Sequence, residues 1–174
     1  MEPWWVTLLR EQQGDDFPDL AGAEAFATIP ISDRLITRAI VQRLPPSAPI
    51  RDLEVRAHAG DQFTVRVRLT AAALLPSVQL RLAIEQQPDL PRSPTLVLGV
   101  VSQGLTGLAI SALKFVDVLP PGVRFDGRRF IVNLATILER YGAAQALTYV
   151  TDLSVTTVEG RVVVRARGTV PGRR

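Results

Sequence analysis

The sequence has no cysteine, a single histidine and a single lysine in 174 residues. Without cysteine there are no disulfides, no thiolate metal ligands and no cysteine nucleophile. Arginine supplies nearly all of the positive charge, and the pI of about 10.1 accompanies a net charge of only +3. A net charge this small is no argument for nucleic-acid binding.

Aromatic residues are also scarce, at 6% of the chain, although hydrophobic residues make up 47%. The apolar content is therefore mostly Leu, Val, Ile and Ala. So much aliphatic surface has to be buried in a core, in an interface or around an apolar ligand. The arginines on the predicted strands also lack aromatic neighbours on which bases could stack, so we expect no nucleic-acid partner.

Sequence signatures of catalysis are absent as well. The chain has no G-x-G-x-x-G, no phosphate-binding loop and no G-x-S-x-G motif. His58 falls on the polar side of a predicted strand, and the acidic residues are scattered without a paired spacing. We therefore expect no catalytic residue, no metal site and no cofactor, and the protein is predicted not to be an enzyme. An active site assembled from distant acids and arginines stays open as an alternative.

What the sequence does contain is strict alternation of apolar and polar residues. Three consecutive strands are predicted between Ile50 and Ile84, with breaks at Gly60-Asp61 and around Pro76. Further strands are predicted over 95–101, 123–125 and 130–134, and a hairpin over 149–157 and 161–169. Strands linked as hairpins, without regular crossover helices, predict an α+β fold with an antiparallel sheet.

Three helices are predicted between these strands. Ser32 to Leu44 has one apolar stripe, Ser32 or Asp33 can cap its start, and two prolines end it. Gly104 to Leu119 is apolar on most sides, so we expect other elements to cover it. A short helix is predicted after Asn133. The two halves share a plan of helix followed by strands, which is too loose to be taken as a repeat.

Residues 1–29 are predicted to form an N-terminal arm, and residues 30–174 a single domain. Trp4 and Trp5 either pack on the domain or anchor the arm at a membrane surface, where tryptophan is favoured. The first ten residues lack the basic region of a signal peptide, and polar residues break the longest uncharged window, 93–113. We expect a protein that is cytoplasmic or peripheral to the cytoplasmic face of the membrane.

Three segments together resemble a known family. They are a helix entry (Ile31–Ile40), a turn with its flanking strands (Leu119–Leu134) and a hairpin (Leu153–Val164). They are similar to bacterial members of the tubular lipid-binding (TULIP) superfamily, especially small phospholipid-binding envelope proteins, over about residues 30–170. The resemblance implies a strongly curved antiparallel β-sheet wrapped around a long apolar helix, with a channel for acyl chains between them and no catalytic residue. The chain departs from the family in showing neither an export signal nor a lipid anchor.

The expected fold class is therefore α+β and TULIP-like. The expected function is non-enzymatic binding of a lipid or fatty-acyl ligand in a hydrophobic cavity between the sheet and the helix over 104–118. The predicted apolar lining consists of Val65, Val67, Leu80, Leu82, Leu105, Leu108, Leu113 and Val164. The same residues would form the core of a protein without a cavity. The alternative is a structural or interaction protein that uses its apolar surface for oligomerisation, for example as a homodimer, and a peripheral membrane contact is compatible with either.

Overall fold

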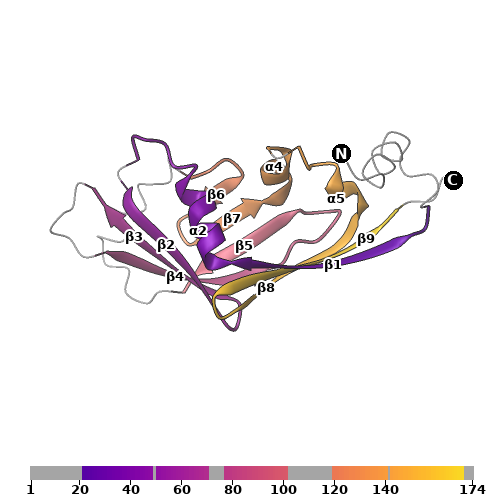
Figure 1. Cartoon of the computed structure of the whole chain (residues 1–174), viewed down its shortest axis with the longest axis horizontal. Coiled ribbons are helices and arrows are strands. Elements are labelled where there is room, and N and C mark those ends of the chain that lie inside the picture. Colours follow the sequence, from indigo (N-terminus) through magenta and orange to yellow (C-terminus); the bar gives the residue numbers. More distant parts are fainter. Residues whose placement is uncertain (1–20, 49, 71–76, 102–118, 141, 171–174) are drawn as a thin grey trace, which may run out of the picture.

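The computed structural model describes residues 21–48, 50–70, 77–101, 119–140 and 142–170 (Figure 1). Strands account for 55% and helices for 15% of this part of the chain. The strands are β1 (Glu24–Ser32), β2 (Ile50–His58), β3 (Gln62–Leu69), β4 (Val78–Gln86), β5 (Thr95–Val100), β6 (Val123–Phe125), β7 (Arg129–Asn133), β8 (Val150–Val158) and β9 (Arg161–Thr169). The helices are α2 (Asp33–Val41), α4 (Leu134–Glu139) and α5 (Ala146–Tyr149).

The described strands form two antiparallel sheets. The smaller sheet has three strands in the order β1-β9-β8, and the larger has six in the order β2-β3-β4-β5-β7-β6. The larger sheet curls into a half-barrel, and the smaller one extends away from it as a long ribbon (Figure 1). Helix α2 follows β1 directly and packs against β2, so it links the two sheets.

The predicted fold class is wrong. The antiparallel, curved sheet is present, but the described helices are short, and none is a long apolar helix that a sheet could wrap. The longest of them, α2, has 9 residues. Most apolar residues alternate with polar ones over long stretches, and that period favours strands, so the described structure is mainly β-sheet. The helix predicted over Gly104 to Leu119 falls almost wholly outside the described residues.

The predicted three-stranded meander is confirmed as β2, β3 and β4, paired in that order. Gly60 (φ 82°) and Asp61 (φ 60°) form its first turn in the left-handed region, which glycine adopts freely and aspartate tolerates. Of the two capping residues predicted for the first helix, Ser32 is the cap, and the predicted cap Asn133 is confirmed. The side chains of Ser32 and Asn133 accept backbone N–H groups in the first turns of α2 and α4.

Strand β1 includes the last residues of the predicted N-terminal arm. It pairs with β9 along its whole length, from Glu24 opposite Thr169 to Ser32 opposite Arg161. Residues 1–20, which include both tryptophans, lie outside the described residues. The start of the described chain is therefore tied to its last strand.

The strands of the hairpins β2–β3 and β8–β9 pair in the same pattern, although their turns differ in length by one residue. Their register shifts at the same place, between Ile50 and Asp52 in one hairpin and between Val150 and Asp152 in the other. Their first strands show nearly the same burial pattern, and each turn contains a left-handed glycine. The structure thus contains two equivalent hairpins, a repeat that the sequence pattern does not predict.

The core lies where these two hairpins meet. Gly160 in the turn of the second hairpin donates a backbone hydrogen bond to Ala57 of the first (2.9 Å), and its carbonyl accepts one from Asp33 of α2 (3.1 Å). The buried cluster takes residues from both sheets: Val55, Ala57, Phe63, Leu82, Leu96, Val155 and Val162. One hydrophobic core therefore holds the two sheets together.

Candidate functional site

The aliphatic face of the curled sheet is only partly covered. Around the buried cluster lies a second set of apolar side chains that are half-buried: Ile36, Ile40, Leu53, Val65, Ile84, Leu98, Val100, Phe130, Val132 and Val164. The small Ala57 is 1% exposed, but no large described side chain has an exposure below 2%. Interiors of proteins this large are normally close-packed, so this face has room for further apolar contacts.

The described members of the predicted lining lie on this face or next to it. Leu82 belongs to the buried cluster, and Val65 and Val164 pack against it from β3 and β9. Leu80 is buried on β4, and Val67 is half-buried on β3. The other three predicted residues, Leu105, Leu108 and Leu113, lie outside the described residues. The role of all eight residues in ligand binding stays a prediction.

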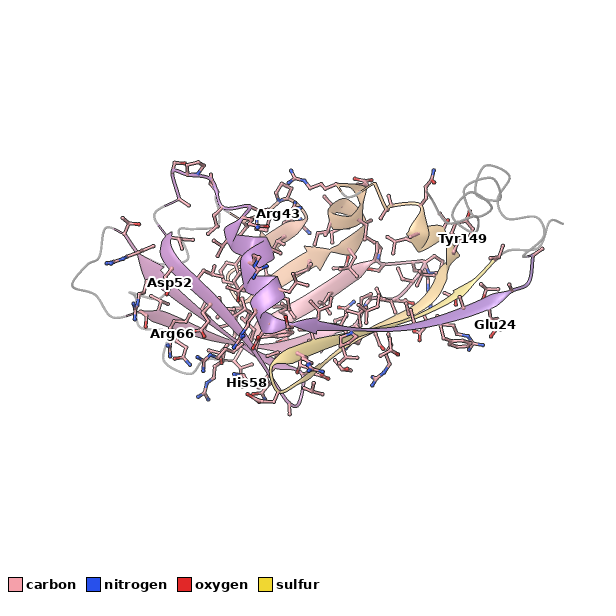
Figure 2. The ribbon with its side chains drawn as sticks, in the orientation of Figure 1. Glu24, Arg43, Asp52, His58, Arg66 and Tyr149 are labelled. Carbon is pink, nitrogen blue, oxygen red and sulfur yellow. The ribbon has the colours of Figure 1, made fainter. Side chains whose placement is uncertain are left out.

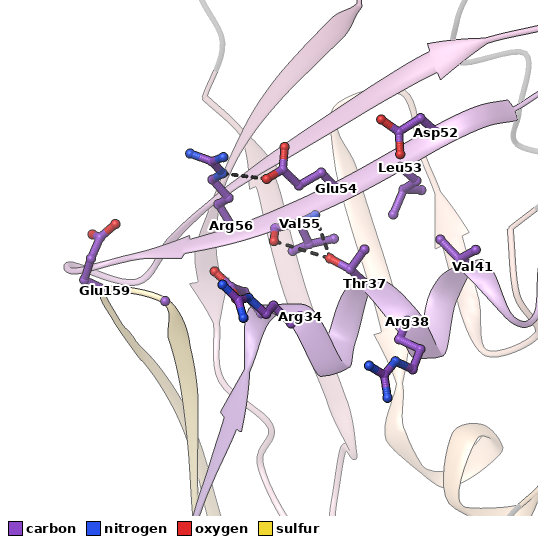
Figure 3. Close-up of a pocket in the computed structure, with 12 residues that line it drawn as sticks. Arg34, Thr37, Arg38, Val41, Asp52, Leu53, Glu54, Val55, Arg56 and Glu159 are labelled. Carbon is purple, nitrogen blue, oxygen red and sulfur yellow. Dashed lines mark hydrogen bonds and ion pairs between the residues drawn. The ribbon is translucent and has the colours of Figure 1, made fainter.

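A groove with a volume of about 690 Å³ runs between α2, the outer edge of β2 and the β8–β9 turn (Figure 3). Its apolar part comes from Val41 of α2 and from Leu53 and Val55 of β2. In Figure 3, Leu53 and Thr37 lie in the space between strand and helix. This volume falls within the range of about 300–1,000 Å³ that is usual for small-molecule sites.

Thr37 closes the floor of the groove by binding the backbone of β2. Its hydroxyl accepts a hydrogen bond from Val55 N (2.9 Å) and donates one to Val55 O (3.4 Å). Both groups belong to an edge strand, and no described strand pairs with them on that side. The threonine therefore satisfies the polar groups of the groove floor, and what remains there is largely aliphatic.

Charged side chains form the rim of the groove. They are the arginines Arg34, Arg38 and Arg56 and the carboxylates Asp33, Asp52, Glu54 and Glu159. Glu54 binds Arg56 (2.8 Å), and this hydrogen bond raises the pKa of Arg56. Arg34 and Arg38 form no ion pair with another described residue. Both are exposed on α2, so their guanidinium groups can pair with an anionic ligand group.

His58 lies between the two hairpin turns. Its Nε2 is 2.9 Å from the Thr64 hydroxyl, and its Nδ1 is 3.5 Å from Glu159 Oε1. This places the imidazole in a surface bridge between the sheets. Within the described ranges, no group of three or more His, Asp and Glu side chains is arranged to hold a metal ion.

Sequence reasoning missed two side chains that bind the backbone of an edge strand from outside. One is Thr37; the other is Gln87, which binds Val155 of β8 through both of its side-chain polar atoms (2.8 and 2.9 Å). The available signal for Thr37 was a polar residue between Ile36 and Ile40, two residues of the predicted apolar stripe. Nothing in the local sequence around Gln87 points to Val155.

Among the described residues, no helix has the length and apolar character that crossing a membrane requires. Comparisons of the chain with protein-family models, with curated proteins and with solved structures find no match.

Proposed function

We propose that this protein binds a lipid or another long apolar ligand without catalysing a reaction on it. The observation that carries the proposal is the aliphatic face of the curled sheet, where ten apolar side chains around the buried cluster are only half-buried and no large described side chain is fully buried. An apolar surface of this kind is stabilised when something apolar covers it. A flexible hydrocarbon chain suits a curved face that presents few polar groups.

The groove is suited to a ligand with a long apolar part and one charged end. Each methylene buried on the aliphatic face contributes about 0.8 kcal/mol, so a long chain can bind with few polar contacts. Arg34 and Arg38, which have no ion-pair partner among the described residues, would receive a carboxylate or phosphate at the rim. The ligand class we infer is a fatty acid or phospholipid whose acyl chain follows Leu53 and Val55 toward the core.

Several predictions from the sequence remain predictions. These are the relationship to bacterial tubular lipid-binding proteins, the absence of catalysis, and a location in the cytoplasm or at the cytoplasmic face of a membrane. The channel around a long helix is not among them, because it belonged to the fold class that the structure contradicts.

The first test is native mass spectrometry of the purified full chain, followed by solvent extraction and lipid analysis. We expect a stoichiometric adduct that the extract identifies as a lipid or fatty acid. A mass equal to that of the bare chain, unchanged after incubation with phospholipids and fatty acids, would overturn the proposal.

A matched pair of substitutions locates the site. Leu53 lines the groove, whereas Leu35 is 53% exposed on α2 and does not line it. In titrations with a fluorescent fatty acid, Leu53→Asn should weaken binding by about tenfold, which corresponds to 1.4 kcal/mol. Leu35→Asn should leave binding unchanged. Equal effects of the two substitutions would place the ligand elsewhere.

The charged end of the ligand has its own test. The double variant R34A/R38A should weaken binding of a fatty acid but not of the fatty alcohol with the same chain length, because only the acid carries a carboxylate. If both ligands lose affinity equally, the arginines act through packing and not through charge.

A further inference from the structure

The described sheets have four edge strands, and three of these are protected. The edges of the larger sheet are β2 and β6, and those of the smaller sheet are β8 and β1. Thr37 binds the outer backbone of β2 at Val55, and Gln87 does the same for β8 at Val155. β6 has only 3 residues, with Arg124 at its centre. Blocked, short or charged edges are the usual means of preventing unwanted strand pairing.

The fourth edge, β1, is long, apolar and open. It has 9 residues, of which eight are exposed, and residues 25–31 carry no charge. Phe26 is 70% exposed and Ile29 is 52% exposed. No described strand pairs with its outer side. A long apolar edge of this kind is a template for adding another strand.

The hydrogen-bond register shows which backbone groups of β1 face outward. Val170 directs both its N–H and its C=O toward the β1 side, to Ala23 and Gly22. The backbone N–H and C=O groups of successive residues in a strand point to opposite sides. The backbone groups that bond to β9 are therefore those of Ala25, Ala27 and Ile29. The backbone groups of Glu24, Phe26 and Thr28 point away from β9. The backbone of Pro30 also faces away from β9, so the N–H that proline lacks is not needed for pairing with β9.

We propose that two copies of this chain pair through β1, antiparallel to each other, about a twofold axis at Phe26. In this register Phe26 lies opposite Phe26 of the partner subunit, and Glu24 lies opposite Thr28 of the partner subunit. Each of these pairs exchanges two backbone hydrogen bonds. The three-stranded sheets then join into one continuous sheet across the axis.

The charges of β1 fit a second copy. Glu24, at the end of β1 far from α2 in Figure 2, already binds Arg167 of β9 (2.9 Å), and the Arg167 guanidinium lies 5.1 Å from the centre of the Phe26 ring. In the proposed register Glu24 faces a threonine, so no like charges oppose each other. An isologous contact requires one self-complementary patch, and this edge provides it. The proposal is independent of ligand binding.

The test uses the full chain in sedimentation velocity over a range of concentrations, with circular dichroism to confirm folding. We expect a dimer. Thr28→Pro removes an outward N–H that β9 does not use, so it should give a folded monomer, whereas Thr28→Val keeps the N–H and should stay dimeric. A monomeric wild type at every concentration, or a dimer that survives Thr28→Pro, would overturn the proposal.

A charge-swap experiment tests the register itself. Phe26→Lys and Phe26→Glu should each be monomeric alone, because position 26 faces itself across the axis and like charges then repel. Mixing the two variants should restore a dimer that contains one chain of each kind. If the mixture stays monomeric while the wild type is dimeric, Phe26 does not lie on the twofold axis and the proposed register is wrong.

Discussion

Val55 and Val155 occupy the same place in two equivalent hairpins, and a side chain from another element binds the outer backbone of each. Thr37 of α2 serves Val55, and Gln87, which follows β4, serves Val155. In both cases one side chain satisfies an N–H and a C=O of an edge strand. In the two hairpins, a hydroxyl and an amide side chain thus satisfy equivalent backbone groups that have no strand partner among the described residues.

Replacing Thr37 by valine should destabilise the protein. The substitution keeps the shape of the side chain but leaves the N–H and C=O of the buried Val55 without a partner. We expect the free energy of unfolding to fall by about 1–3 kcal/mol, measured by urea denaturation. Thr37→Ser keeps the hydroxyl and should lose much less. Equal losses for the two variants would show that the methyl group, and not the hydroxyl, matters.

Gln87 should behave in the same way on the other hairpin. Gln87→Leu removes both hydrogen bonds to Val155, and we again expect a loss of about 1–3 kcal/mol in the free energy of unfolding. The neighbouring Gln86 provides a matched control because it is exposed on β4. Gln86→Leu should change the stability by no more than about 0.5 kcal/mol. A similar loss for both variants would contradict the proposed role.

Asp61 combines two roles that a set of substitutions separates. Its backbone has a φ of 60°, and its Oδ1 accepts a hydrogen bond from Thr157 N (2.9 Å), which joins the two sheets. Asn keeps the acceptor and tolerates this conformation, glycine keeps only the conformation, and alanine keeps neither.

The stability of the Asp61 variants, measured by thermal or chemical denaturation, should therefore fall in the order Asn, Gly, Ala. Losing the hydrogen bond alone should cost about 1–3 kcal/mol. If Asp61→Ala and Asp61→Gly prove equally stable, the backbone conformation carries no cost at this turn.

The pKa of Asp126 should lie below 3.8, its ordinary value. The main cause is its Oδ1, which accepts hydrogen bonds from the backbone N–H groups of Arg128 (3.1 Å) and Arg129 (2.9 Å). Because the pKa is lowered on folding, the unfolded chain takes up the proton first as the pH falls. The contribution of Asp126 to stability is therefore complete above pH 3.8 and is lost as the pH falls through the native pKa.

Carbon-detected NMR titration of the Asp126 carboxyl group measures this pKa directly. Arg129→Ala removes the guanidinium but keeps the backbone N–H, so the pKa should remain lowered in this variant. A return to 3.8 in Arg129→Ala would mean that the charge of Arg129, and not the backbone hydrogen bonds, is the main cause.

Local features of the fold followed from the sequence. Alternation of apolar and polar residues predicted the meander and the last hairpin, and Ser32 and Asn133 predicted two helix starts. These features depend on neighbours within a few residues, through side-chain direction and short-range hydrogen bonds. The apolar stripe of α2 was less accurate, because Leu35 is 53% exposed while Ile36 packs on the core.

The candidate site was only partly predictable. Val65, Leu82 and Val164 lie on or beside the aliphatic face, because strand period alone assigns them to one side, and their contact with a ligand stays a prediction. The groove along β2 was not predicted, since it exists only where α2 and the β8–β9 turn approach that strand. Thr37 and Gln87 take their roles from backbone groups that are distant in sequence.

Strands, turns and helix caps were thus determined by short stretches of the sequence. Sterics and hydrogen bonds to near neighbours decide the backbone conformation that such a stretch prefers. The pairing of β1 with β9, the separation into two sheets and the open edge at Phe26 were decided only by the folded chain. A strand carries the same alternation whichever strand it pairs with. Partners are therefore chosen by the burial and hydrogen bonding of the whole assembly, which no local pattern encodes.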